Sequence, residues 1–170
     1  IFGHIYSYSP NGFFQINLPV YELALTEIKK HINTDKVLDL YAGVGTIGLS
    51  VARDKNLTLV EVDKAAFKEL KNNAKNAKTI LAKSEEVLEY IAPDQTVILD
   101  PPRAGCDRKL IDRLLEVSPR RIIYLSCNPA TQARDVKMLL TKYQIEAIKT
   151  FNFFPRTPHI ENLIILEPKN

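Results

Sequence analysis

Two side chains in the second half of the chain have the chemistry for covalent catalysis, the thiol of Cys127 and the carboxylate of Glu161. Cys127 directly follows the apolar run 121–126, and a helix is expected from Ala130. The start of a helix favours a thiolate, so this position predicts a lowered thiol pKa and a nucleophile. The alternative is an inert buried cysteine, which is the interpretation that we favour for Cys106.

Glu161 ends the segment FPRTPHIE, which leads into the last apolar run of the chain. Two prolines restrict the backbone of this segment and deliver His159 and Glu161 to fixed places. We expect Glu161 to be a general base whose pKa is tuned by burial. The alternative is that His159 packs against the protein and Glu161 begins a strand in solvent.

A glycine-rich loop, DLYAGVGTIG at residues 39–48, follows an apolar run and precedes a helical pattern. Gly43, Gly45 and Gly48 have the spacing of a dinucleotide fingerprint, and Glu61 ends the next run, where a ribose-binding carboxylate is expected. Such a loop binds NAD(P) or S-adenosylmethionine, or it is a tight turn without a ligand. The motif alone does not separate these three possibilities.

The sequence DPPR at residues 100–103 places Asp100 at the end of another apolar run. Two prolines make the following loop stiff, which suits a site that grips a planar base, although a rigid surface turn is the alternative. Methyltransferases that act on exocyclic amines carry similar loops with an aromatic residue after the prolines. Arg103 stands at that place here, and together with Arg108 it could meet phosphate.

These residues are separated by alternating strand and helix patterns. Continuous apolar strands that alternate with amphipathic helices predict an α/β fold, a doubly wound and mostly parallel sheet. Pro19 is expected to start the first helix, with Asn17 as its cap. No helix pattern separates the last two strands, so we expect an antiparallel end to the sheet. The expected strands are 37–40, 57–62, 97–100, 121–126, 145–150 and 162–166.

Composition sets limits on function. The 170 residues are 45% hydrophobic and 25% charged, with a net charge of +3 and two cysteines. This is a globular composition for one domain, and its mild basic bias is compatible with a nucleic acid partner. Two cysteines exclude a disulfide scaffold and a multi-cysteine metal site, so we expect no metal. With no membrane-length apolar run and no signal peptide, we expect a cytoplasmic protein.

Five motifs occur in an order that resembles the catalytic domain of the bacterial RNA (uracil-5) methyltransferases, which modify 23S rRNA and tRNA. The rRNA-modifying branch is the more similar one. The family implies a seven-stranded Rossmann-like sheet with an antiparallel last strand, and S-adenosylmethionine as cofactor. The motifs are FFQIN at 13–17, the glycine loop at 39–48, DPPRAG at 100–105, SCNPAT at 126–131 with ARD at 133–135, and FPRTPHIE at 154–161.

The resemblance also implies roles for single residues. Cys127 matches the family's nucleophile and Glu161 its general base, which together would methylate carbon 5 of a uridine through a covalent adduct. The glycine loop contributes Gly43 and Gly45 to the cofactor site. The other positions that match cofactor contacts are Gln15, Tyr41, Thr46, Glu61, Asp100 and, on the adenine side, Ser84.

The expected organisation is residues 1–17 as the end of a preceding region and 18–170 as the catalytic domain. Family members usually carry an amino-terminal OB-like RNA-binding domain, which this chain does not contain, so we expect an isolated catalytic domain. Three alternatives stay open: an NAD(P)-dependent oxidoreductase, an amine methyltransferase, and a non-catalytic module that binds cofactor and RNA. The first leaves the loops at Asp100 and Cys127 unexplained.

Overall fold

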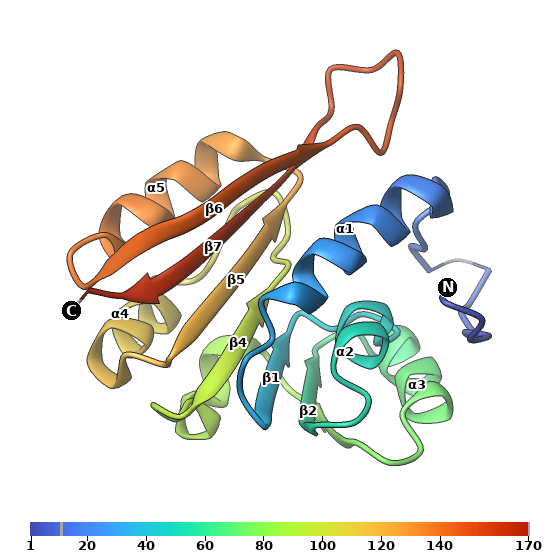
Figure 1. Ribbon diagram of the computed structural model, residues 1–170. Coiled ribbons are helices and arrows are strands. Elements are labelled where there is room, and N and C mark those ends of the chain that lie inside the picture. Colours follow the sequence, from blue (N-terminus) through green and yellow to red (C-terminus); the bar gives the residue numbers. More distant parts are fainter. Residues whose placement is uncertain (11, 170) are drawn as a thin grey trace.

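The computed structural model describes residues 1–10 and 12–169 and arranges its helices around one twisted sheet (Figure 1). The elements are α1 (Leu18–Lys30), β1 (Lys36–Leu40), α2 (Thr46–Val51), β2 (Asn56–Glu61), α3 (Lys64–Asn73), β3 (Lys78–Leu81), the 3₁₀ turns η1 (Ser84–Glu86) and η2 (Leu88–Tyr90), β4 (Gln95–Leu99), α4 (Arg108–Val117), β5 (Arg121–Ser126), α5 (Pro129–Leu139), β6 (Tyr143–Phe151) and β7 (Glu161–Pro168).

The seven strands have the order β3-β2-β1-β4-β5-β7-β6. Strands β1 to β5 are parallel to one another, whereas β7 runs antiparallel to both of its neighbours. The predicted doubly wound sheet with an antiparallel end is therefore confirmed. Sequence patterns missed β3, because its four residues, KTIL, are only partly buried and carry little apolar periodicity.

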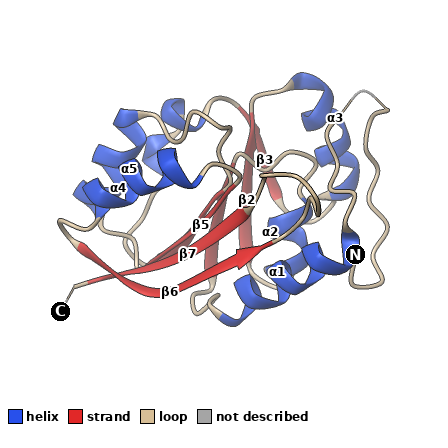
Figure 2. Cartoon of the chain, turned by 90° about the horizontal axis from the view of Figure 1, so that it is seen from above, coloured by secondary structure: helices blue, strands red, loops and turns tan. Residues whose placement is uncertain are grey.

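Helices cover both faces of the sheet (Figure 2). Successive residues of a buried strand point to opposite faces, so each strand contributes to two apolar cores. One core receives Leu25 of α1 and Leu70 of α3, together with side chains of α2. The other core receives Leu110 of α4 and Leu139 of α5. No helix in the described part of the chain is both long and apolar enough to cross a membrane.

The carboxyl ends of the parallel strands meet at one edge of the sheet, and most of the predicted site residues follow these strand ends. Strand β7 starts at this edge because it is antiparallel, and Ser126 of β5 pairs with Asn162 of β7. Cys127 follows Ser126 and Glu161 precedes Asn162, so both residues stand next to the pair at which this ladder ends. The loop 152–160, which leads to Glu161, projects beyond the same edge (Figure 1).

The first helix begins as predicted, with a proline in its first turn, but its cap differs from the expectation. Asn17 occupies the cap position and makes no side-chain capping bond. Its amide nitrogen instead donates to the Phe153 carbonyl, 3.1 Å away. The predicted capping role is therefore wrong, because the side chain is used to tie the start of α1 to the loop before Glu161.

Candidate active site

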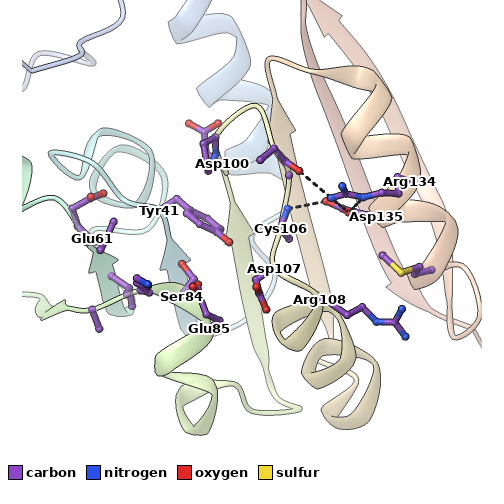
Figure 3. Close-up of a pocket in the computed structure, with 18 residues that line it drawn as sticks. Tyr41, Glu61, Ser84, Glu85, Asp100, Cys106, Asp107, Arg108, Arg134 and Asp135 are labelled. Atoms are coloured by element: carbon purple, nitrogen blue, oxygen red, sulfur yellow. Dashed lines mark hydrogen bonds and ion pairs between the residues drawn. The ribbon is translucent and has the colours of Figure 1, made fainter.

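A cavity of about 950 Å³ opens at the carboxyl edge of the sheet, between β2 and the loops after β3 and β4 (Figure 3). Four of the predicted cofactor residues line it, each from a different strand end: Tyr41, Glu61, Ser84 and Asp100. Parallel strands bring their carboxyl ends together, which explains how residues so far apart in sequence share one cavity. The cavity is large enough for a nucleoside-sized ligand.

The glycine loop is fixed to the cavity wall by the carboxylate of Glu61. The Gly43 N–H donates to one Glu61 oxygen and the Asp63 N–H to the other, both at 2.7 Å. Gly43 has a left-handed backbone (φ +56°), and no protein atom lies within 4 Å of the place where a Cβ would stand. The loop therefore leaves open space beside a carboxylate, as a ligand that approaches the backbone closely requires.

Tyr41, at the end of β1, also has a left-handed backbone, with φ +67°. This conformation costs a bulky residue about 1–3 kcal/mol, and it turns the phenol ring toward the cavity (Figure 3). Burial raises the pKa of Tyr41, so the side chain stays a neutral phenol at physiological pH. The fold thus holds an uncharged aromatic ring against the space for a ligand.

Asp39, the residue that begins the glycine motif, lies beneath the loop and is completely buried. Its Oδ2 accepts a hydrogen bond of 2.9 Å from Gly48, where a Cβ would lie only 2.7 Å from the same oxygen. Burial, together with the nearby Glu61 charge, raises the pKa of Asp39 to about 7. Gly48 is needed here because only a residue without a side chain lets the helix approach this carboxyl.

The remaining four predicted cofactor residues, Gly43, Gly45, Thr46 and Gln15, are not among the residues that line the cavity. Gly45 packs inward, where a Cβ would lie 2.6 Å from the Leu70 side chain. The Thr46 hydroxyl is 2.9 Å from the hydroxyl of Tyr21. Gln15 has its Oε1 buried without a hydrogen-bond partner among the described residues. Their contact with a ligand stays a prediction.

Cys127 and Glu161 are not among the residues that line the cavity, but both interact with Asp100, which does line it. The charges of Glu161 and Asp100 both raise the pKa of the Cys127 thiol. The Glu161 charge also raises the pKa of the Asp100 carboxyl. Arg103 interacts with both Cys127 and Glu161. The structure therefore brings the predicted nucleophile and base together, as the β5–β7 register requires.

The predicted direction of the Cys127 pKa shift is wrong. Burial above all, and then the charges of Glu161 and Asp100, raise the pKa of this thiol, while Arg103 opposes them. The Asn128 side chain caps the start of α5 by accepting from the Ala130 N–H. Arg103, which the sequence suggested only as a phosphate contact, is thus the cation that favours the thiolate.

Burial raises the pKa of Glu161 to about 7, as expected for a base tuned by its surroundings. Only 6% of the surface of this residue is exposed to solvent. A carboxylate with a pKa near neutrality can both accept a proton and return it to water. The loop of prolines before Glu161 and the ladder of β7 after it hold this group in place.

Asp135 on α5 holds the loop that follows Asp100, although sequence reasoning assigned it no role. The side chain is completely buried and accepts hydrogen bonds from Tyr124 Oη and the Cys106 N–H, both at 2.8 Å, and from Arg134. Arg134 also donates to the Ala104 carbonyl (Figure 3). Cys106 itself is buried, as predicted, and it also lines the cavity.

Replacing Asp135 by alanine is expected to destabilise the protein by about 3–5 kcal/mol, because a buried carboxylate with four donors is lost and these donors lose their partner. Chemical denaturation followed by circular dichroism measures this loss. Asp112→Ala is the matched control, since Asp112 is an exposed carboxylate that pairs with Arg108 on one helix face. Equal midpoints for the two variants would show that the Asp135 network does not stabilise the fold.

Comparison with known proteins adds to this geometry. The profile of a family described as "Methyltransferase small domain" matches residues 21–123, and that of "tRNA (Uracil-5-)-methyltransferase" matches residues 86–169. A solved structure, the tRNA (uracil-54, C5)-methyltransferase of Pyrococcus abyssi in complex with S-adenosyl-L-homocysteine, has a TM-score of 0.86 and 37% identity over 95% of this chain. The chain belongs to a methyltransferase family, and its second half resembles the RNA (uracil-5-)-methyltransferases.

Curated relatives agree with this membership. An uncharacterized RNA methyltransferase of Mycoplasma mobile is 39% identical over 94% of this methyltransferase chain, and one of Bacillus cereus is 37% identical over 95% of it. The chain covers 46% and 38% of these two proteins and 41% of the Pyrococcus abyssi chain, so it spans less than half of each. A precorrin-6y C5,15-methyltransferase of Geobacter metallireducens, at 13% identity and a TM-score of 0.70, shares the fold alone.

Proposed function

We propose that this chain is the catalytic domain of an S-adenosylmethionine-dependent enzyme that methylates carbon 5 of a uridine in RNA through a covalent adduct with Cys127. The observation that carries the proposal is that Cys127 and Glu161 flank the last pair of the β5–β7 ladder and interact with each other and with Asp100, which lines a nucleoside-sized cavity. The sequence motifs favour 23S rRNA as substrate, whereas the matching profile and the Pyrococcus abyssi relative are named for tRNA. Both RNAs are therefore to be tested.

The residues around the cavity fit S-adenosylmethionine. The open space at Gly43 admits a ligand close to the backbone, and the Glu61 carboxylate beside it suits ribose hydroxyls. Ser84 lies where an adenine-side contact is expected, and Tyr41 and Asp100 complete the wall. When bound, S-adenosylmethionine supplies a methyl group on a positively charged sulfur, and the carboxylates on this side of the site complement that charge.

Cys127 and Glu161 divide the chemistry on the base between them. Carbon 5 of uracil is a weak nucleophile, so the Cys127 thiolate first adds to carbon 6, and the electron pair of the double bond moves toward the carbonyl at position 4. Carbon 5 of this enolate then accepts the methyl group. Glu161 removes the proton from carbon 5, the double bond forms again, and the bond between carbon 6 and sulfur breaks to release the thiolate.

Arg103 and the stiff loop before it support this sequence of steps. The guanidinium faces Cys127 and lowers the pKa of a thiol that burial and two carboxylates raise. Because the target base must reach a thiol at the sheet edge, it has to leave its stack in the RNA. The two prolines after Asp100 keep the wall of this site rigid while the base enters.

Gly43→Ala is expected to weaken binding of S-adenosylhomocysteine about tenfold, because a methyl group would enter the open space and a left-handed backbone would be imposed on alanine. Isothermal titration calorimetry measures this affinity. Gly3→Ala is the matched control, since Gly3 also has a positive φ and open space but lies in the amino-terminal segment, away from the cavity. Equal losses in the two variants would mean that Gly43 does not border the ligand.

The function is tested by transfer of a labelled methyl group from S-adenosylmethionine to unmodified transcripts of tRNA and 23S rRNA, followed by nucleoside mass spectrometry. The expected product is 5-methyluridine in one of the two transcripts. Calorimetry with NAD addresses the oxidoreductase alternative, which the same glycine loop leaves open. Tight NAD binding without binding of S-adenosylhomocysteine would overturn the proposal.

A further inference from the structure

Gln132 is a completely buried glutamine on α5, the helix that begins just after Cys127. All of its amide hydrogen-bonding groups point at the two strands that carry the candidate nucleophile and base. Its Nε2 donates to the Tyr124 carbonyl of β5 at 2.9 Å and to the Asn162 carbonyl of β7 at 3.0 Å. Its Oε1 accepts from the Asn162 side chain at 2.7 Å.

These three bonds lie at the point where the β5–β7 ladder ends. Asn162 pairs with Ser126, the last residue of β5, so Glu161 and Cys127 come one step later. Beyond them the chain enters the loop 152–160 on one side and α5 on the other. The last pair of a strand ladder frays unless something holds it, and Gln132 is a side chain from a third element that holds both strands here.

We propose that Gln132 and Asn162 form a positioning pair that sets the separation of Glu161 from Cys127. This inference rests on the proposed function, because it assigns the pair a purpose in that reaction. Neither residue touches the reacting atoms, and both act through the backbone of β7. Gln132→Met keeps the length of the side chain but removes all three bonds, so the first residues of β7 keep their pairing with β6 and lose this tie to β5.

The thiol of Cys127 reports on this separation without RNA or cofactor. The Glu161 charge raises the pKa of Cys127, so a Glu161 that moves away lets this pKa fall. Alkylation by iodoacetamide, measured against pH with mass spectrometry of the Cys127 peptide, gives the pKa. We expect Glu161→Gln to lower it most and Gln132→Met to lower it in the same direction.

Two further variants make the titration decisive. Gln144→Met is the matched control, because Gln144 is a glutamine on the same sheet whose amide pairs with Glu167 at an exposed position. Asn162→Ala keeps both bonds from Gln132 Nε2, to the Tyr124 and Asn162 carbonyls, removes only the bond to Gln132 Oε1, and serves if Gln132→Met does not fold. If both variants at the pair keep the wild-type Cys127 pKa, whatever their thermal stability, the pair is only structural and the inference fails.

Exchange at carbon 5 connects the pair to catalysis. Addition of the Cys127 thiolate to carbon 6, protonation of carbon 5 from water, removal of the original hydrogen by Glu161 and loss of the thiolate return uridine unchanged. Tritium at carbon 5 of a tRNA or 23S rRNA transcript is thus released to water without cofactor. We expect Gln132→Met to slow this release at least about tenfold, since small displacements of catalytic groups have such effects.

The two experiments separate the two claims. If the wild-type protein releases no tritium from either transcript and transfers no methyl group, the proposed function is wrong, and the positioning role falls with it. If the wild-type protein releases tritium and Gln132→Met releases it at the same rate with an unshifted Cys127 pKa, the function stands and only the positioning pair is refuted.

Discussion

Replacing Cys127 by alanine is expected to abolish methyl transfer to RNA, with a loss of at least about 10³-fold, because the variant lacks the thiolate that adds to carbon 6 of the base. The same variant is expected to lose the covalent complex with RNA that carries 5-fluorouridine. Fluorine cannot leave carbon 5 as a proton, so the adduct cannot break down after methyl transfer. Denaturing gel electrophoresis of the protein with labelled RNA measures this complex.

Cys106→Ala is the matched control for this prediction. It makes the same change at a second cysteine, which lies beside Asp135 in the wall of the cavity and is assigned no bond to the base in the proposed reaction. The gel-stable complex is expected to persist in this variant. If the complex survives in Cys127→Ala and disappears in Cys106→Ala, the nucleophile is Cys106 and the assignment to Cys127 is wrong.

Replacing Glu161 by glutamine has the second largest expected effect, a loss of about 10²–10⁴-fold in the release of methylated product. The change is nearly isosteric but removes the base, so thiolate addition and methyl transfer proceed while carbon 5 keeps its proton. A covalent complex is therefore expected to accumulate on ordinary uridine RNA, where the wild-type protein shows little. Quenched single-turnover reactions, run on gels, follow this complex over time.

The pH dependence follows from the raised pKa of Glu161, which is about 7. A base acts in its ionised form, so product release by the wild-type protein rises with pH through this value and is slow at pH 6. Glu161→Gln is expected to lose this rise around pH 7. Product release by the variant at the wild-type rate would refute the role of Glu161 as the base.

Much of this site is predictable because the residues stand directly at the ends of strong strand signals. The glycine loop, Asp100 and Cys127 each follow a continuous apolar run, and parallel strands bring such ends to one edge. Glu161 stands at the start of the last strand. Because that strand is antiparallel, its start lies at the same edge as the ends of the parallel strands. Strand β3 was missed because its short, half-buried run carries no such signal.

The residues that sequence reasoning missed act through long-range contacts. Asp135 gains its role only when the loop after Asp100 packs on α5, and Gln132 only when β7 inserts beside β5. A polar residue within a helix is normally read as solvent-exposed, and nothing in its neighbours indicates burial. The Cys127 pKa was assigned the wrong direction for the same reason, since burial and the charges of Glu161 and Asp100 come from the fold.

The central claim is that Cys127 forms a covalent bond with the target uridine. Its most direct test is mass spectrometry of the peptides and nucleotides from the protein after reaction with S-adenosylmethionine and a 5-fluorouridine transcript. We predict that the peptide containing Cys127 carries a nucleotide increased in mass by the transferred methyl group. A nucleotide attached to any other residue, or full methylation of ordinary transcript with no attached nucleotide in the fluorinated one, would contradict this account.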